Sequence, residues 1–312
     1  MLRAILRGLT VASLSTAAMF AASYTFTDIL PANSSDTTVA GLNNAGTLTG
    51  WYCPAGGGCP VAYTDSNGAF TTLLPNGSIG DYGGGLNNVG NAVGQYVYYS
   101  GNTQIYTGYE YSGGSFATIS DPNGSGTGVW GINDSGAMVG SYYNGTQDLG
   151  FLDNNGVFTN ISDPNSGTYG TEAFGINNNG EIVGTYYDAS NNPNGFSELN
   201  GVYTTIDVPG ALFTEVYGIN NLGQIVGGYQ GNTGFHGFVD NGGIFTTIDD
   251  PGSNGYSYLR GINDSGELVG EYENSSNKEI AFTATPNATP EPGTLLLMTG
   301  AALLIAAFRR IS

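Results

Sequence analysis

Residues 131–140 read Gly-Ile-Asn-Asp-Ser-Gly-Ala-Met-Val-Gly. Asn and Asp tolerate left-handed backbone dihedral angles and Gly adopts positive φ without strain, so the centre of this phrase, Asn133 to Gly136, has the composition of a tight turn. On both sides of the turn, apolar residues alternate with small or polar ones, which is the period of a β-strand. The phrase therefore predicts a β-hairpin.

The hairpin phrase is one of six copies of Gly-Ile/Leu-Asn-Asn/Asp-x-Gly-x-x-Val/Thr-Gly. An aromatic-Thr/Ala-x-Ile/Leu phrase precedes each copy, and a shorter phrase ending in an aromatic residue precedes that one, except at the chain ends. Four strands in roughly 40–50 residues predict a propeller blade. The hairpin phrases start 43 to 46 residues apart, at 41–50, 85–94, 131–140, 175–184, 218–227 and 261–270. The aromatic residues of the first flanking phrase are Phe26, Phe70, Phe116, Phe158, Tyr203 and Phe245, and those of the shorter one are Tyr63, Tyr106, Phe151, Phe196, Phe238 and Phe282.

The two ends of the repeat array complement each other. The first repeat lacks the shorter aromatic phrase because it opens with Phe26-Thr27-Asp28-Ile29, and a spare copy, Ile280-Ala281-Phe282-Thr283, follows the last hairpin. If these segments share one blade, six permuted repeats close into a ring without an exposed sheet edge. The sequence therefore predicts an all-β, six-bladed β-propeller with N/C-terminal strand closure over residues 24–286. A β-solenoid is the alternative, and no helix is expected outside the terminal segments.

The composition excludes several classes of function. Between residues 24 and 290 the only basic residues are Arg260 and Lys278, against 24 acidic ones, which gives this part a net charge of −22. A surface that negative repels phosphates, which excludes nucleic acid as a partner. With one histidine and two cysteines in 312 residues, neither a His/Cys metal cluster nor a histidine-dependent triad is expected.

The first 23 residues have the parts of a secretory signal peptide. Arg3 and Arg7 form a positive region, the apolar run 8–20 follows, and small residues lead up to Ser23. We therefore expect signal peptidase to cleave between Ser23 and Tyr24. An N-terminal anchor that is left uncut is the alternative, although the run is short for a membrane span.

Residues 287–312 combine a proline-containing motif, an apolar run and a basic end. The motif is Pro290-Glu291-Pro292, the run 294–308 predicts a transmembrane helix, and Arg309 and Arg310 suit cytoplasmic headgroups. This order closely resembles the PEP-CTERM sorting signal of exported bacterial proteins. The resemblance implies a membrane-held intermediate that an exosortase-type transpeptidase processes, in bacteria that build extracellular polysaccharide. A plain C-terminal tail anchor is the alternative.

One repeat contains the phrase His236-Gly237-Phe238, followed by residues 245–252 and by Gly261-Ile262-Asn263. On this phrase the repeats resemble the HAF family of extracellular repeats, named after His-Ala-Phe. The resemblance spans residues 26 to 282 and implies an extracellular location and a repeat architecture, with no catalytic residue to carry over. We interpret His236, the sole histidine, as a packing residue of the repeat, and a ligand contact is the alternative.

Two further features concern stability and ions. Cys53 and Cys59 flank a Gly-rich loop in a chain addressed for export, which predicts a disulfide formed in the oxidising periplasm. The many oxygen donors on the loops make calcium the cofactor to consider, although no Asp-x-Asp-x-Asp-Gly loop is present. No other cofactor and no metal-binding residue is assigned.

Carboxylates are the side chains most suited to catalysis here. Asp134 and Asp264 alternate with Asn in the repeated turns, which indicates turn capping rather than proton transfer. A polysaccharide hydrolase needs one specific pair of acids, so two non-repeating acids in one pocket would indicate an enzyme. Acids spread over the repeated turns would indicate a scaffold. The acids that follow no repeat are Glu110, Glu172, Glu198 and Glu215.

The aromatic residues divide in the same way. Those that repeat are expected in the core between blades, and those that do not repeat suit stacking on sugar rings. The non-repeating residues are Trp51, Tyr98, Tyr99, Tyr106, Tyr109, Tyr111, Trp130, Tyr143, Tyr187, Tyr256 and Tyr258.

These patterns predict an exported, surface- or matrix-associated repeat protein that contacts extracellular polysaccharide without catalysis. The alternative is a carboxylate-dependent polysaccharide hydrolase or lyase on the propeller scaffold. No catalytic residue is assigned.

Overall fold

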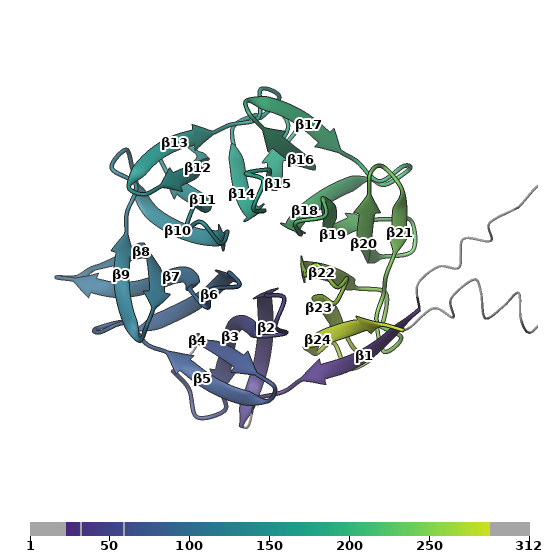
Figure 1. Ribbon diagram of the computed structural model, residues 1–312, viewed down its shortest axis with the longest axis horizontal. Helices are drawn as coiled ribbons and strands as arrows, with labels where there is room; N and C mark the ends of the chain where they lie inside the picture. Colours follow the sequence, from purple (N-terminus) through teal and green to yellow (C-terminus); the bar gives the residue numbers. More distant parts are fainter. Residues whose placement is uncertain (1–22, 32, 59, 288–312) are drawn as a thin grey trace, which may run out of the picture. The chain divides into compact units, whose positions relative to one another are not determined.

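The computed structural model describes residues 23–31, 33–58 and 60–287. They form six four-stranded antiparallel sheets arranged as blades around a central axis, which confirms the predicted all-β, six-bladed propeller (Figure 1). Residues of all six inner strands line cavities at this axis, which we call the channel. The inner strands are β2 (Ser34–Leu42), β6 (Gly80–Leu86), β10 (Ser125–Ile132), β14 (Thr171–Ile176), β18 (Phe213–Ile219) and β22 (Ser257–Ile262). The second strands are β3 (Leu48–Pro54), β7 (Ala92–Ser100), β11 (Met138–Tyr143), β15 (Ile182–Tyr187), β19 (Gln224–Gln230) and β23 (Leu268–Glu273).

The outer half of each blade completes the sheet. The third strands are β4 (Val61–Ser66), β8 (Thr103–Ser112), β12 (Asp148–Asn154), β16 (Pro193–Leu199), β20 (Phe235–Asn241) and β24 (Glu279–Pro286). The outermost strands are β5 (Ala69–Leu73), β9 (Ser115–Ile119), β13 (Val157–Ile161), β17 (Val202–Ile206), β21 (Phe245–Thr247) and β1 (Tyr24–Ile29).

The last blade joins the two ends of the repeat array. Strand β1 pairs antiparallel with β24, from Tyr24 opposite Pro286 to Ile29 opposite Ala281. The two strands lie side by side in Figure 1. The predicted strand closure is therefore confirmed, and it gives the ring its last pairing.

The first asparagine of each hairpin turn links its blade to the next. Its Oδ1 accepts backbone N–H groups of its own turn, as Asn133 does from Ser135 and Ala137 at 3.1 and 3.0 Å. Its Nδ2 donates to the backbone carbonyl of the equivalent asparagine in the neighbouring blade at 3.0 to 3.3 Å. These six bonds form a closed ring, the asparagine ring: Asn43, Asn87, Asn133, Asn177, Asn220, Asn263 and back to Asn43.

The glycine that opens each hairpin phrase lies where neighbouring inner strands touch. A Cβ placed on any of the six would lie 3.2 to 3.3 Å from the Cα of an equivalent glycine in an adjacent blade. That spacing is tighter than most Cβ contacts, so glycine at this position lets the strands approach closely. The six glycines are Gly41, Gly85, Gly131, Gly175, Gly218 and Gly261.

One aromatic pair fills the outer core of each blade. A fully buried ring on the third strand packs on a ring of the outermost strand, as Phe151 does on Phe158 with centroids 5.3 Å apart. Tyr109 holds this buried position in the second blade, and Tyr106, which the sequence assigned to it, is 42% exposed. The assignment of Tyr106 was wrong because the β7–β8 hairpin is longer than its counterparts.

Several sequence predictions concern residues that the structure does not describe. The signal peptide, apart from Ser23, and the sorting signal with Pro290, Glu291, Pro292, Arg309 and Arg310 lie outside the described residues and stay predictions. Cys53 is the second-last residue of β3, but Cys59 is not described, so the disulfide also stays a prediction. Within the described residues, no helix has the length and apolar composition to span a membrane.

Replacing Asn177 by Asp tests the asparagine ring. The change keeps the Oδ1 acceptor for the turn but places a carboxylate oxygen against the carbonyl of Asn220, where an amide now donates at 3.3 Å. We expect the free energy of unfolding to fall by about 2 kcal/mol in urea denaturation. Asn179→Asp makes the same chemical change at an exposed position of the same turn and should cost under about 0.5 kcal/mol. Equal losses in the two variants would contradict the role of the ring.

Candidate functional site

A β-bulge in each inner strand turns one residue into the channel. The pairing of inner and second strands shifts just before the repeated glycine, for example between Val129 and Gly131. Such bulges re-aim side chains and are frequent beside binding sites. The six bulged residues all line one cavity and differ from blade to blade: Ala40, Gly84, Trp130, Phe174, Tyr217 and Arg260.

This channel cavity has a volume of about 230 Å³. The small residues Ala40 and Gly84 leave open space in two neighbouring blades, where the other blades carry large side chains. Trp51 and Tyr82 line the cavity beside this space and contact each other edge to face, with centroids 5.7 Å apart. Trp130 is a further wall, so both tryptophans of the protein lie at the cavity.

Arg260 is held in the wall of the channel cavity by two tyrosines. Its guanidinium carbon lies 4.4 Å from the ring centre of Tyr217 and 4.7 Å from that of Tyr258, which are cation–π contacts. One hydrogen bond, from Nη2 to the Tyr258 hydroxyl at 3.3 Å, is its side-chain bond within the described part of the chain. Burial alone would lower the pKa of Arg260, but Tyr258 and Glu271 raise it above its ordinary value, so the group stays charged.

Acidic side chains surround this arginine without pairing with it directly. Glu172 and Glu215 occupy equivalent positions on the neighbouring inner strands β14 and β18. Burial, together with the carboxylates of Asp148 and Glu215, raises the pKa of Glu172 to about 7. Burial also raises the pKa of Glu271 to about 7, against the lowering effect of Arg260. Both carboxyl groups therefore change charge near neutral pH.

The four non-repeating acids named from the sequence do not all come together. Glu215 acts electrostatically on Glu172, whereas Glu110 accepts a hydrogen bond from Asn91 at 2.9 Å. Glu198 accepts the backbone N–H of Gly201, the hairpin role that Asp153 and Asp240 have in their blades, so Glu198 follows the repeat after all. Sequence reasoning missed Glu271. Its position in the repeat could have revealed it, because Glu271 occupies on β23 the place that Trp51 occupies on β3.

A second polar ring surrounds the turn end of the channel. The second residue of each hairpin turn donates its backbone N–H to the side-chain Oδ1 of the next blade's equivalent residue at 2.8 to 2.9 Å. Asp134 and Asp264 occupy two of these six places, and each also accepts the Nδ2 groups of both flanking asparagines. Burial opposes ionisation, but these bonds lower the pKa of both carboxyls. The side chains of both aspartates thus bind the turns of neighbouring blades, whereas Asn133 and Asn263 cap the turns in which the aspartates lie. The predicted side-chain-to-backbone bonding is present, but it joins blades.

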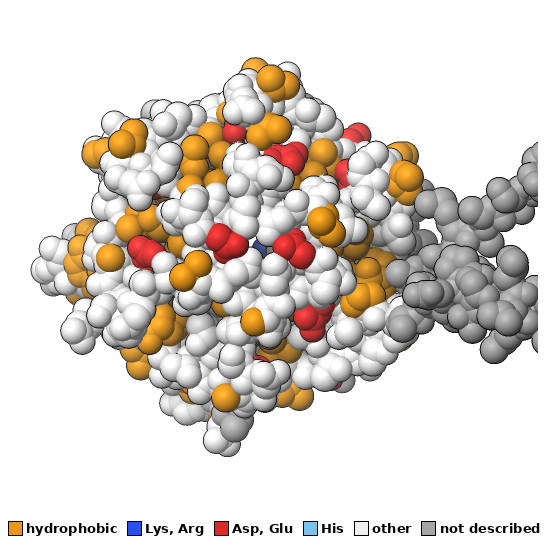
Figure 2. Space-filling model, viewed as in Figure 1, with side chains coloured by type: hydrophobic (Ala, Val, Ile, Leu, Met, Phe, Trp, Pro, Cys, Tyr) orange, Lys and Arg blue, Asp and Glu red, His pale blue; other side chains and the backbone are white. Residues whose placement is uncertain are grey.

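The channel opens on a face with both signs of charge. Figure 2 shows acidic side chains on either side of the central opening and a basic side chain inside it. In the described part of the chain, no group of three or more His, Cys, Asp or Glu is placed to hold a metal ion. The calcium hypothesis accordingly has no assigned ligand set and stays a prediction.

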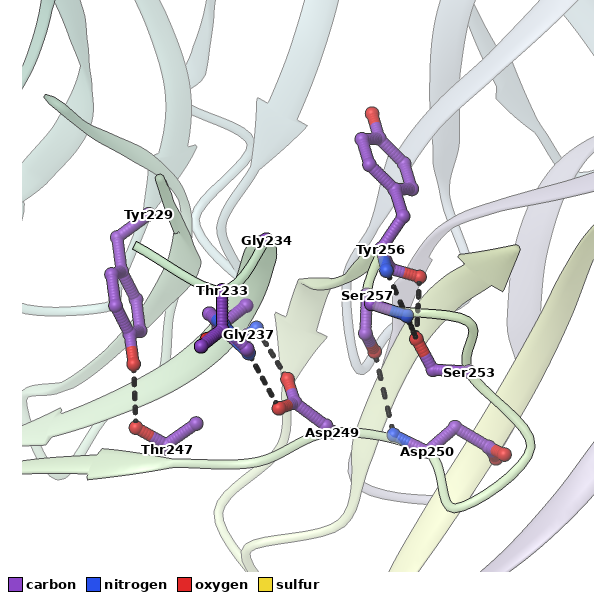
Figure 3. Close-up of polar contacts among 12 residues, drawn as sticks. Tyr229, Thr233, Gly234, Gly237, Thr247, Asp249, Asp250, Ser253, Tyr256 and Ser257 are labelled. Carbon is purple, nitrogen blue, oxygen red and sulfur yellow. Dashed lines mark hydrogen bonds and ion pairs between the residues drawn. The ribbon is translucent and has the colours of Figure 1, made fainter. Parts of the chain in front are cut away.

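His236 lies on β20 between a hydroxyl and a carboxylate. Its Nδ1 is 2.7 Å from Oδ2 of Asp249 and its Nε2 is 2.9 Å from Oγ1 of Thr233. The other oxygen of Asp249 accepts the backbone N–H of Gly237 at 3.1 Å, so Asp249 ties the start of β20 to the loop after β21 (Figure 3). Composition argued against any histidine-dependent relay, yet this sole histidine does join a hydroxyl to a carboxylate. We interpret the arrangement as a clamp between strands, because Asp249 also bonds to backbone.

The non-repeating aromatic residues take three kinds of place. Trp51 and Trp130 line the channel cavity, as a sugar-stacking role requires. Tyr109 and Tyr258 are buried within the blades, and Tyr99 is exposed on the β7–β8 hairpin. The cavity residues that the sequence did not single out are Tyr82, Phe174, Tyr217 and Arg260.

The fold has counterparts among solved structures. A mutant of AofleA from Arthrobotrys oligospora matches with a TM-score of 0.51 and 11% identity, over 86% of this chain and 91% of that one. Aleuria aurantia lectin in complex with Fucα1-6GlcNAc matches with a TM-score of 0.49 and 12% identity, over 84% and 100%. A gluconolactonase from Xanthomonas campestris matches with a TM-score of 0.47 and 11% identity, over 82% and 88%. No protein-family profile and no curated protein sequence matches the chain. At these identities the likeness concerns the fold alone.

Replacing Glu172 by Gln tests the charge buried beside the channel. Because the pKa of Glu172 in the folded protein is raised to about 7, ionising it opposes folding, and stability is lost as pH rises from about 4.5 through 7. The variant should therefore be more stable than wild type by about 2 kcal/mol at pH 8 and no more stable at pH 4. Thermal and urea unfolding across this pH range measure the difference. A Glu181→Gln control on the same blade should show no such pH-dependent gain, and a gain at pH 4 would contradict the prediction.

Proposed function

We propose that this chain is an exported, surface- or matrix-associated protein that binds extracellular polysaccharide in the channel cavity and does not cleave it. The observation that carries the proposal is the set of six bulged positions, where a repetitive scaffold presents residues that differ in every blade around one cavity. Repeated side chains serve the scaffold, so a set of differing side chains around one cavity favours a binding role.

The cavity suits one sugar residue. Aromatic faces stack on the apolar faces of sugar rings, and Trp51, Tyr82 and Trp130 supply such faces beside the hydroxyl of Thr38. Its volume of about 230 Å³ is below the roughly 300–1,000 Å³ of sites for drug-sized ligands. A terminal or protruding sugar of a polymer therefore fits better than a stretch of chain.

Delivery to the cell surface rests on the terminal segments. The signal peptide and the PEP-CTERM-like end with Pro290, Glu291 and Pro292 support export, followed by processing by signal peptidase and an exosortase-type transpeptidase. In this proposal the apolar run 294–308 holds the protein at the membrane until it is processed.

Replacing Trp51 by Ala tests the binding site. Titration calorimetry of the full-length protein against a panel of neutral and acidic oligosaccharides, with and without calcium, should identify a ligand. Loss of the indole should weaken its binding at least about tenfold, because a buried tryptophan at a binding site contributes about 2 kcal/mol. Tyr99→Ala removes an exposed aromatic ring on the β7–β8 hairpin and should leave the affinity unchanged. Equal binding by wild type and Trp51→Ala would place the site elsewhere.

An enzyme is the second candidate, favoured by Glu172 and Glu215. These two non-repeating acids lie close enough for the carboxylate of Glu215 to raise the pKa of Glu172. A carboxyl group with a pKa near 7 beside a second carboxylate has the properties of a general acid with its partner.

Release of reducing or unsaturated ends from the bound polysaccharide decides between the two functions. Under our proposal, wild type and Glu172→Gln both give no product above the background of a heat-denatured sample. Turnover by wild type that falls at least about 100-fold in both Glu172→Gln and Glu215→Gln would instead establish the hydrolase or lyase.

A further inference from the structure

We propose that the channel cavity recognises the carboxylate of a uronic acid residue through Arg260. This inference rests on the proposed polysaccharide binding and names the class of sugar. The repeat pattern does not explain why an arginine stands at this position, because the other five bulged residues are glycine, alanine or aromatic.

The guanidinium of Arg260 has unused hydrogen-bond donors. Arginine carries five N–H groups in one plane, and in the described part of the chain this side chain makes one hydrogen bond, to the Tyr258 hydroxyl at 3.3 Å. No carboxylate among the described residues lies within ion-pair distance of it. Because Arg260 lines the cavity, a ligand there can reach the remaining donors.

The glutamates nearest to Arg260 are held by other partners. Oε2 of Glu215 accepts the Tyr217 hydroxyl at 2.7 Å. The two oxygens of Glu271 accept the Tyr258 hydroxyl and, at 3.0 Å, the backbone N–H of Val39. The two tyrosines that contact the guanidinium therefore also bind these carboxylates.

This packing leaves an opening for a planar anion. The rings of Tyr217 and Tyr258 lie 4.4 and 4.7 Å from the guanidinium carbon and 6.1 Å from each other, so they cover one side of the group and leave the edge toward the cavity to a ligand. A carboxylate fits that edge with two parallel hydrogen bonds. The aromatic walls of Trp51 and Trp130 take a sugar ring. A ring that carries a carboxylate, a uronic acid residue, uses both features.

The affinity should depend on pH because acidic groups surround the site. Glu271, whose charge acts on Arg260, has a pKa raised to about 7 and loses its negative charge as pH falls from 8 to 6, while the ligand's carboxylate stays ionised. The pKa of Glu172 on β14 is also raised to about 7. Repulsion of the ligand then decreases, so binding should strengthen. The titratable groups that act on Arg260 and these two acids are Asp148, Glu215, Tyr217, Tyr258 and Glu279.

Tryptophan fluorescence of the full-length protein reports on this cavity, since both tryptophans line it. The probes are trisaccharides of galacturonic, glucuronic and mannuronic acid, each compared with its methyl ester, together with a neutral galactose trisaccharide. The ester keeps the ring and its linkages and removes the charge. At least one acid should bind about 10- to 100-fold more tightly than its ester, and more tightly at pH 6 than at pH 8.

Two variants separate the site from the overall charge. Arg260→Gln and Lys278→Gln each remove one of the two basic residues of the described chain. Arg260→Gln should abolish the preference for acid over ester, and Lys278→Gln should keep it. If Arg260→Gln does not fold, Arg260→Lys keeps the charge without the planar fork and should reduce the preference.

The outcomes are distinct. Acids that bind no better than their esters in every pair, or a preference that survives Arg260→Gln, would overturn the uronic acid assignment and leave polysaccharide binding intact. Binding of none of these probes, neutral or acidic, and of none in the wider oligosaccharide panel would overturn both proposals.

Discussion

The asparagine ring is the constraint on which the rest of this propeller depends. Each of its six bonds joins a side-chain amide of one blade to a backbone carbonyl of the next, and the asparagines are buried. A single hydrogen bond contributes only about 1 kcal/mol, but a buried carbonyl left without its donor costs more than that. Every blade must therefore present its turn at the same height. The glycine two residues before each asparagine adds to this constraint, since neighbouring inner strands touch there.

The ring leaves the bulged residues next to it free to differ between blades. The bulge before the glycine gives each blade one residue that faces the channel. This residue takes no part in the hydrogen bonds of the asparagine ring. Such a position can carry Gly84 in one blade and Trp130 in the next without disturbing the turn. A chain of near-identical repeats thereby builds an asymmetric cavity.

The sequence predicted the blades and their closure because both follow from a repeated pattern. Turn residues at a fixed period identify strands, and the spare phrase at Ile280 identifies the strand that β1 completes. The cavity was predicted only in part. Trp51 and Trp130 stand out by residue type, but Tyr217 and Arg260 become recognisable only when the bulge shows which residue of the inner strand faces the channel. Local strand alternation does not reveal a bulge. Tyr106 was assigned to the buried position of its blade for a similar reason, because the longer β7–β8 hairpin shifts that position to Tyr109.

The net negative charge of the chain makes an arginine such as Arg260, without an ion pair within the described residues, unusual. In a chain whose residues 24–290 carry a net charge of −22, a cation is expected to be neutralised by a neighbouring acid; here the charge of Glu271 acts on Arg260 and that of Glu215 acts on the adjacent Tyr217. Both instead accept hydrogen bonds from the tyrosines whose rings pack on the guanidinium. The two cation–π contacts and the hydrogen bond to the Tyr258 hydroxyl fix the position of the positive charge. The negative charge of the protein repels anions, and Arg260 attracts them at one place. Together they favour a ligand with a single negative charge that reaches Arg260 and with an otherwise uncharged ring.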